Sequence, residues 1–208
     1  MQSLISDSKL AIILLAAGEG SRLGFYPKAL LEKNGTPLIK RFWKEALNLK
    51  PCECITVLGS YADQIQPLAE EYSKVVINPN PKQGQAVSVR LGLEALQSNY
   101  DYLIVALIDQ PKVTVAELRL LTDYAATLDD SIDAVVPCYQ GQRGNPVLFK
   151  RKVIDAILGK PSQSCRDWLD QNTNRVVFFD TNQDGYIRDI DLESDLVKEG
   201  VNRRALKD

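Results

Sequence analysis

The sequence contains no histidine among its 208 residues. This absence excludes Ser-His-Asp hydrolysis, Cys-His proteolysis and histidine general-base catalysis, because each of these mechanisms needs an imidazole. Any reaction must therefore use carboxylates, lysine, arginine, backbone dipoles or a metal ion.

The sequence also lacks the cysteine spacing of a zinc site. The four cysteines are Cys52, Cys54, Cys138 and Cys165. None of them forms a C-x-x-C pair, and no histidine is present to complete a set of zinc ligands. Reduced thiols in a cytoplasmic protein are therefore the expected state.

A strong net charge and a long apolar run are missing as well. Lys and Arg total 25 against 27 Asp and Glu, which gives a net charge of -2, so a nucleic-acid partner is not expected. No apolar run approaches the ~20 residues that span a bilayer, and no basic start with an apolar core marks a signal peptide. We expect a soluble, cytoplasmic protein without a membrane partner.

Apolar runs and amphipathic stretches alternate along the chain. Runs typical of buried parallel strands occupy residues 10–16, 55–58, 75–77 and 103–108. Helical spacing follows Gly84 and Pro111, and Thr114 and Glu117 form a capping box before the second helix. This alternation predicts an α/β fold of three layers, α/β/α, around a mostly parallel mixed sheet. No linker divides residues 1–208, so we expect a single domain.

The last third of the chain has shorter apolar runs. These lie at residues 134–137, 146–149, 176–179 and 186–190. We predict that they form strands added to the sheet in antiparallel fashion. Residues 182–185 are predicted to form a tight hairpin turn, in which Asp-Gly supplies the positive φ angles, and a final helix is expected to begin near Leu192.

Residues 180–191, DTNQDGYIRDID, match much of an EF-hand calcium loop. Asp180, Asn182 and Asp184 stand at positions 1, 3 and 5, and Gly185 stands at position 6. Position 12 is Asp191 instead of Glu, and the preceding residues are typical of a strand rather than of a helix. We therefore favour a polar hairpin turn, and whether the first three side chains bind any cation is left open.

The strongest chemical signal is LAAGEGSRLGFYPK, residues 15–28, directly after the first apolar run. Gly18, Gly20 and Gly24 let the backbone fold tightly and direct its N–H groups at an anion, and Arg22 and Lys28 add positive charge. The spacing matches neither the Walker sequence nor G-x-G-x-x-G. A phosphate-binding loop and a tight turn with two surface cations both remain open from these residues alone.

The order of several motifs along the chain resembles a known family. Leu15-Ala16-Ala17-Gly18, Arg22-Leu23-Gly24 and Pro27-Lys28 resemble the signature of nucleotidyltransferases with a GT-A-type, Rossmann-like fold. NPNPKQGQAVSVRLGL (78–93), IDQP (108–111), GQRGNPVLF (141–149) and DIDLESDL (189–196) resemble the MobA-like molybdenum cofactor nucleotidyltransferases, and their cytidylyltransferase branch more than their guanylyltransferase branch.

This resemblance implies a reaction, a cofactor and partners. The reaction is transfer of a nucleoside monophosphate from an NTP, with CTP favoured, to the terminal phosphate of a molybdopterin-type cofactor, with release of pyrophosphate. Mg²⁺ is the implied cofactor, and a molybdoenzyme that receives the product is the implied protein partner.

The resemblance also implies roles for individual residues. Arg22, Lys28 and Asp109 are implied as catalytic, with Lys28 at the α-phosphate. The implied nucleotide-binding residues are Leu15, Ala16, Ala17, Gly18, Gly20, Lys28, Asn78, Gly84 and Ser88. The implied acceptor-binding residues are Arg143, Asn145 and Arg166. Asp109 and Asp191 are implied as the Mg²⁺ ligands; a helix N-cap for Asp109 and a solvent-facing Ser88 are the alternatives.

Departures from the family pattern leave other acceptors open. Gly20 replaces a common Ser, and the interval from Gly24 to Lys28 is one residue longer, as in sugar nucleotidyltransferases. In PSQSCR (161–166) only Arg166 matches the stretch Gly-Asp-x-Gly-Ala-Arg of the cytidylyltransferases. A sugar-phosphate or other small-molecule nucleotidyltransferase is therefore the alternative, and a non-catalytic nucleotide-binding chaperone for cofactor insertion is a third hypothesis.

Overall fold

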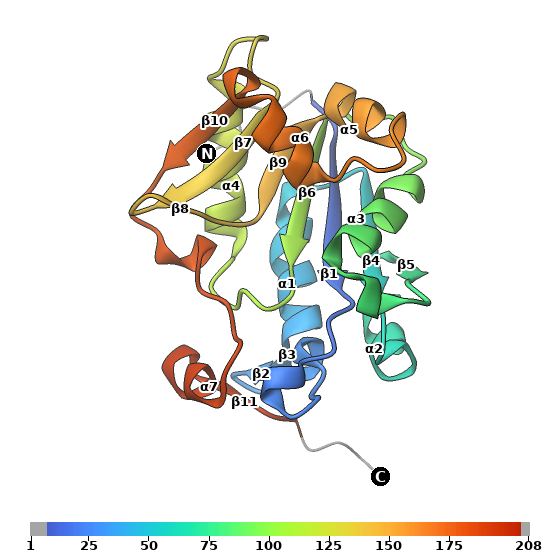
Figure 1. The fold of residues 1–208 in the computed structure, drawn as a ribbon. Helices are drawn as coiled ribbons and strands as arrows, with labels where there is room; N and C mark the ends of the chain where they lie inside the picture. Colours follow the sequence, from blue (N-terminus) through green and yellow to red (C-terminus); the bar gives the residue numbers. More distant parts are fainter. Residues whose placement is uncertain (1–7, 205–208) are drawn as a thin grey trace.

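The computed structural model describes residues 8–204, which form one large mixed sheet with helices on both faces. The strands of this sheet are β1 (Leu10–Ala16), β4 (Glu53–Leu58), β5 (Lys74–Ile77), β6 (Tyr102–Leu107), β7 (Ala134–Tyr139), β8 (Gln142–Arg143), β9 (Val147–Lys150) and β10 (Val176–Asp180). They lie in the order β10-β7-β9-β6-β1-β4-β5, with β8 paired to β7 (Figure 1). Only β9 and the short β8 run antiparallel to their neighbours. The predicted α/β class with a mostly parallel mixed sheet is confirmed.

All helices except the last divide between the two faces of the sheet, and the last lies apart at one end of the molecule (Figure 1). They are α1 (Leu38–Ala46), α2 (Ala62–Ala69), α3 (Gln85–Glu94), α4 (Val115–Ala126), α5 (Arg151–Leu158), α6 (Cys165–Gln171) and α7 (Glu193–Glu199). Every residue of β1 is buried, because Ile12 and Leu14 face a core built with α1, α2 and α4, whereas Ile13 and Leu15 face a core built with α3, α5 and α6. Burial on both faces is why this strand is continuously apolar.

A second, small sheet ties the end of the described chain to the residues after the glycine-rich loop. Its strands are β2 (Glu32–Lys33), β3 (Thr36–Pro37) and β11 (Val201–Asn202). All are antiparallel, in the order β11-β2-β3, and they lie beside α7 at one end of the molecule (Figure 1). The segment between β10 and α7 therefore has to cross from the main sheet to this end.

The elements predicted for the first two thirds of the chain are confirmed. Each of the four apolar runs forms a parallel strand, and α3 and α4 follow Gly84 and Pro111. The predicted burial is wrong for β5, which lies at the edge of the sheet and has no buried residue. The capping box of α4 is present, with the Thr114 backbone N–H donating to Glu117 Oε2 at 2.9 Å. The four cysteines carry no disulfide, as expected. None of the helices in residues 8–204 is long and apolar enough to cross a bilayer.

Two predictions for the last third are wrong. Strand β10 pairs with β7 in parallel rather than antiparallel fashion, and residues 186–190 form no strand. Residues 184–186 form a 3-10 turn instead of part of a hairpin, because Tyr186 is fully buried and its hydroxyl donates to the Glu117 carbonyl at 2.7 Å. Gly185 serves close packing rather than a positive φ, since a Cβ there would lie 3.0 Å from Lys112 Cβ.

The calcium-like spacing in residues 180–191 is not part of an EF-hand. The segment is preceded by β10 instead of a helix. The carboxylate of Asp184 accepts hydrogen bonds from Lys112 and Arg188, each at 3.0 Å, so two cations already hold it. The final helix, α7, begins at Glu193, one residue after the predicted start.

Candidate active site

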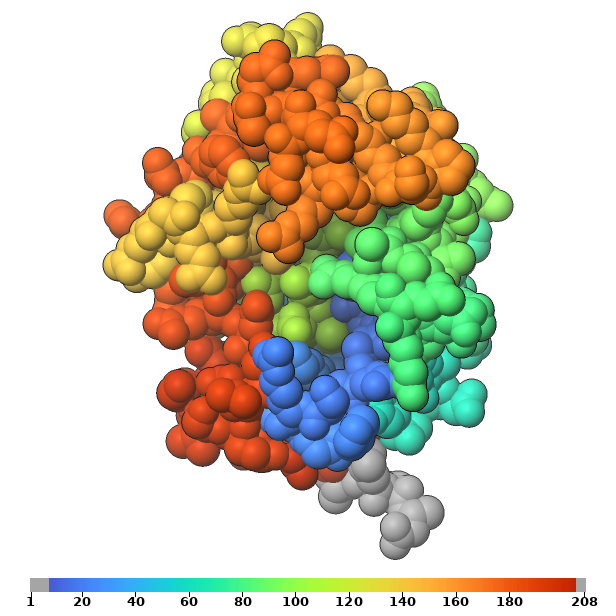
Figure 2. Space-filling model, in the orientation of Figure 1, coloured from blue at the N-terminus to red at the C-terminus, as the bar shows by residue number. Residues whose placement is uncertain are grey.

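A cleft opens where β1 and β6 end, at the edge of the sheet where open α/β folds bind ligands. Its volume is about 370 Å³. Figure 2 shows the hollow between the glycine-rich loop (blue), α3 (green) and the segment before α7 (red). The predicted site residues that line it are Leu15, Ala16, Ala17, Gly18, Gly20, Arg22, Lys28, Gly84, Ser88, Asp109 and Asp191. The structure thus brings together the predicted catalytic residues, the predicted metal ligands and all but one of the predicted nucleotide-binding residues.

The glycine-rich loop needs glycine at position 20. Gly20 has φ +60°, and a Cβ on it would lie 2.1 Å from the backbone oxygen of Tyr26. The Gly20 carbonyl accepts hydrogen bonds from the N–H groups of Leu23 and Phe25, at 2.9 and 3.0 Å. This close approach curls the chain so that Arg22 and Lys28 both reach the cleft.

The same loop is fixed from two sides by side chains of other elements. The Tyr61 hydroxyl, just before α2, contacts the carbonyls of Glu19 and Phe25. On the other side, Arg203 donates to the Leu23 carbonyl at 2.9 Å. The loop is therefore held in one conformation, which is what an anion-binding backbone requires.

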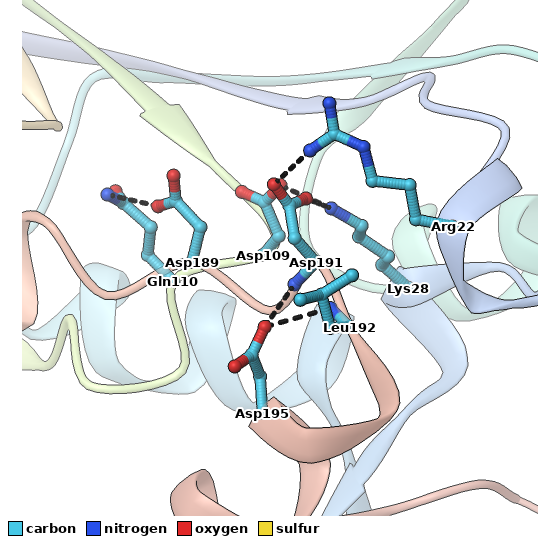
Figure 3. Close-up of polar contacts among 8 residues, drawn as sticks. All are labelled: Arg22, Lys28, Asp109, Gln110, Asp189, Asp191, Leu192 and Asp195. Carbon is cyan, nitrogen blue, oxygen red and sulfur yellow. Dashed lines mark hydrogen bonds and ion pairs between the residues drawn. The ribbon is translucent and has the colours of Figure 1, made fainter.

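Four charged side chains meet at the end of the cleft nearest to β6. The Lys28 ammonium lies 2.9 Å from Asp109 Oδ2 and 2.7 Å from Asp191 Oδ1. Arg22 Nη1 lies 2.9 Å from Asp191 Oδ2 (Figure 3). Lys28 is largely buried, with 15% of its side chain exposed, whereas Arg22 is 71% exposed. Asp109 and Asp191 therefore converge, as the resemblance implies, with an ammonium group between them.

Ionisation in this cluster is set by opposing effects. Burial disfavours the charged form of Lys28, but the charge of Asp109 and the hydrogen bonds to Asp191 and Asp109 raise the Lys28 pKa above its ordinary value. The hydrogen bond from Lys28 in turn lowers the pKa of Asp191. Opposite charges at this distance favour the ionised forms of both Lys28 and Asp191.

Two residues that lie close to the predicted metal ligands in the sequence, Gln110 and Asp189, were missed, although neither lines the cleft. Gln110 is buried, and its amide donates to the Tyr186 carbonyl at 2.8 Å. The same amide donates to Asp189 Oδ1 at 2.9 Å (Figure 3). Desolvation of the Asp189 carboxylate, together with the charges of Asp109 and Asp191, raises the pKa of Asp189 to about 6. Both residues stand in the motifs IDQP and DIDLESDL, so their position directly beside the predicted ligands was the available signal.

The backbone around Asp191 is also fixed. Asp195 Oδ2 accepts hydrogen bonds from the N–H groups of Asp191 and Leu192, at 3.1 and 2.8 Å. The Ile190 N–H donates to the Asp109 carbonyl at 2.9 Å. These bonds fasten the segment before α7 directly to the end of β6, although the two are far apart in the sequence.

The residues present fit a Mg²⁺ ion. Asp109 Oδ1 is buried and has no hydrogen-bond partner, which is costly for a carboxylate unless a cation or water satisfies it. Mg²⁺ prefers one or two carboxylates with phosphate oxygens and water, and Asp109 and Asp191 offer such a pair beside an open cleft. Residues 8–204 contain no group of three or more cysteine or acidic side chains set to hold a metal alone. Substrate oxygens and water would have to complete the coordination.

The opposite end of the cleft is built from the segment 78–88. Gly84 has φ +101° and directly precedes α3, and Ser88 is buried on the first turn of that helix. Asn78 is buried behind the cleft, where its Oδ1 accepts from the Asn80 N–H at 2.8 Å and its Nδ2 donates to Ser88 Oγ at 2.9 Å. Asn78 does not line the cleft, so its position supports Ser88 rather than a direct contact.

The three predicted acceptor-binding residues do not line the cleft. Arg143 donates to Asp170 Oδ1 at 2.6 Å and stacks over the Phe178 ring at 4.8 Å. The Asn145 backbone N–H donates to the Tyr186 carbonyl at 2.8 Å, and Arg166 is exposed on α6. In Figure 2 the segment around β8 (yellow) and α6 (orange) lie above the hollow. The acceptor-binding role of these three residues remains a prediction.

Comparison with known proteins identifies a matching family model and several relatives. The family model of the MobA-like NTP transferase domain matches residues 12–176. The chain is 34% identical to the bifunctional protein GlmU of Prochlorococcus marinus over 172 residues, which are 81% of this chain and 38% of that protein. It is 26% identical to a probable molybdenum cofactor guanylyltransferase of Synechococcus elongatus over 163 residues, which are 76% of this chain and 82% of that protein.

The fold is shared with solved structures. Rv0371c from Mycobacterium tuberculosis superimposes with a TM-score of 0.75 and 23% sequence identity, covering 92% of this chain and 97% of that one. The predicted Rossmann-like fold is therefore confirmed. Curated relatives such as GlmU are longer proteins, of which this chain spans well under two thirds.

Proposed function

Because this chain belongs to the family of MobA-like NTP transferase domains, we propose that it is a nucleotidyltransferase that acts on the terminal phosphate of a molybdopterin-type cofactor. The donor in this proposal is CTP, and the products are a cytidine dinucleotide form of the cofactor and pyrophosphate. We also propose that the protein acts in the cytoplasm, where NTPs are available, and that a molybdoenzyme is the partner that receives the product.

The observation that carries the proposal is the charge arrangement at the end of β6. Two cations, Lys28 and Arg22, and two carboxylates, Asp109 and Asp191, meet at the rim of a glycine-rich loop. Phosphoryl chemistry of this kind depends on positioning and on neutralising charge that builds on the phosphate in the transition state. A buried ammonium with a raised pKa is suited to that task at neutral pH.

The proposed reaction needs no general base. The acceptor phosphate is already ionised, so it can attack the α-phosphorus in line while the loop and Lys28 hold the triphosphate. Asp109 and Asp191 would hold Mg²⁺, which supplies Lewis-acid polarisation of the phosphate oxygens when bound. The absence of histidine is consistent with this chemistry.

The far end of the cleft favours one orientation of the nucleotide, with its base or ribose near Ser88. The Asn80 N–H fixes the orientation of the Asn78 amide, and the amide then donates to Ser88 Oγ. The hydroxyl hydrogen of Ser88 is left for an acceptor in the cleft, such as a base or ribose oxygen. The triphosphate would then extend along the loop to Lys28.

A sugar phosphate is the alternative acceptor. The position of Arg143 and Arg166 outside the cleft favours it, because neither cation is placed to hold a bound pterin phosphate. A non-catalytic nucleotide-binding chaperone is less well supported, since the two cations and both carboxylates are in place.

The test is pyrophosphate release with CTP, GTP, UTP and ATP, each paired with molybdopterin or with a panel of sugar 1-phosphates. The proposal expects release with CTP and molybdopterin. Release with a sugar 1-phosphate alone would support the alternative, and no release with any pair would support the chaperone.

A further inference from the structure

The carboxylate pair proposed to hold a metal is already occupied by cationic side chains. Lys28 Nζ contacts Asp109 Oδ2 and Asp191 Oδ1, and Arg22 contacts Asp191 Oδ2. Of the four carboxylate oxygens, three therefore accept from a cation, and only Asp109 Oδ1 has no partner. A metal ion that uses both carboxylates would therefore compete with these contacts.

Both the size and the charge of the Lys28 ammonium oppose the binding of a metal ion between the two carboxylates. Mg²⁺ binds oxygens at about 2.0–2.1 Å and needs near-ideal geometry. An ammonium at 2.7 and 2.9 Å from one oxygen of each carboxylate lies in the space between the two groups. The cations would repel each other in a place where Lys28 is only 15% exposed and therefore poorly screened by solvent.

We propose that Lys28 is an internal cation that occupies the Asp109–Asp191 pair in the nucleotide-free protein and yields it to a divalent metal as the nucleotide binds. This proposal rests on the proposed function, because the triphosphate gives the displaced ammonium its new partner. The metal site is then weak in the free protein and becomes strong only in the presence of nucleotide.

The coupling between the two ligands follows from this exchange. Nucleotide phosphates attract Lys28 away from the carboxylates, and a metal on the carboxylates frees Lys28 for the phosphates. By linkage, each ligand tightens the binding of the other by the same factor.

The first test is a titration of the intact protein with Mn²⁺ in the absence of nucleotide. Binding is measured from the electron paramagnetic resonance signal of the Mn²⁺ that remains free. Lys28→Met is expected to bind Mn²⁺ at least tenfold more tightly than the wild type. Lys82→Met is the matched control, because Lys82 is 84% exposed beside Glu19 at 3.9 Å and its substitution is expected to change nothing. Equal or weaker binding by Lys28→Met would overturn the proposal.

A double variant tests whether the tighter Mn²⁺ binding of Lys28→Met occurs at Asp109. Adding Asp109→Asn to Lys28→Met should abolish the tighter binding, whereas a retained gain would place the metal elsewhere and contradict the proposal. Circular dichroism of each variant establishes that it is folded before its affinity is compared.

A second measurement uses the wild-type chain, so it does not depend on the variants. Saturating Mg²⁺ should accelerate acetylation of Lys28 by acetic anhydride, read by mass spectrometry, because the ammonium loses its two carboxylate partners. Lys82 is the internal reference. Unchanged labelling of Lys28 would refute the exchange. None of these experiments requires turnover, so their failure is distinct from failure of the pyrophosphate assay.

Discussion

Replacement of Gly20 by alanine should disable nucleotide binding through backbone displacement alone. The new Cβ would lie 2.1 Å from the Tyr26 oxygen, where ordinary contacts exceed 3 Å, so the loop must open by about 1 Å. A displacement of about 1 Å at a positioned site can cost about 100-fold in rate. We therefore expect kcat/KM for the NTP to fall about 100-fold in Gly20→Ala.

A matched control separates this displacement from backbone strain. Gly35 has φ +71° but no neighbour within 4 Å of its would-be Cβ, so Gly35→Ala carries the strain without the clash. Alanine in this conformation costs roughly 1–2 kcal/mol, so both variants should lose stability in urea unfolding. Only Gly20→Ala should lose kcat/KM. Equal kcat/KM values for the two variants would refute the reasoning.

Three further predictions concern single side chains. Asp109→Ala should abolish Mg²⁺-dependent pyrophosphate release while circular dichroism stays unchanged, and wild-type turnover would contradict the metal role. Tyr186→Phe should lower the free energy of unfolding by about 1 kcal/mol, measured in urea, because it removes the hydrogen bond to the Glu117 carbonyl. The hydrogen bond from Lys112 lowers the pKa of Asp184, so this carboxylate contributes stability above its unfolded pKa of about 4 and loses it as the pH falls through the lower folded value. The thermal unfolding midpoint of Asp184→Asn should therefore lie below that of the wild type at pH 7, and the two midpoints should converge near pH 2.

The central strands of the sheet could be predicted from the sequence because they are buried on both faces. β1 and β6 are continuously apolar for that reason, and the capping box at Thr114 marks the start of α4 directly. Strand direction was not predictable in the last third, because β10 reaches a parallel position beside β7 only through the intervening α5 and α6.

The segment 184–191 shows why the local pattern failed. Tyr186 and Ile190 are both fully buried, which mimics the spacing of a strand. They are buried instead by long-range contacts, in which Tyr186 bonds to Glu117 and the Ile190 N–H bonds to the Asp109 carbonyl. No short-range signal in the sequence encodes those partners.

The sequence predicted which residues form the candidate site better than it predicted the contacts between them. The motifs identified Lys28, Asp109 and Asp191, but the ammonium between the two carboxylates depends on side-chain geometry that spacing does not contain. Likewise, the motif around Arg143 gave no sign that Asp170, on another element, holds its guanidinium.

The central claim is transfer of a nucleoside monophosphate to a phosphorylated acceptor at the Lys28–Asp109–Asp191 cluster. Its most direct test is a single turnover with CTP labelled on the α-phosphate, molybdopterin and Mg²⁺, compared between the wild type and Asp109→Asn. We expect the label to move into a cytidine dinucleotide of the acceptor in the wild type only. Label that stays in CTP, or that is transferred equally by the variant, would contradict it.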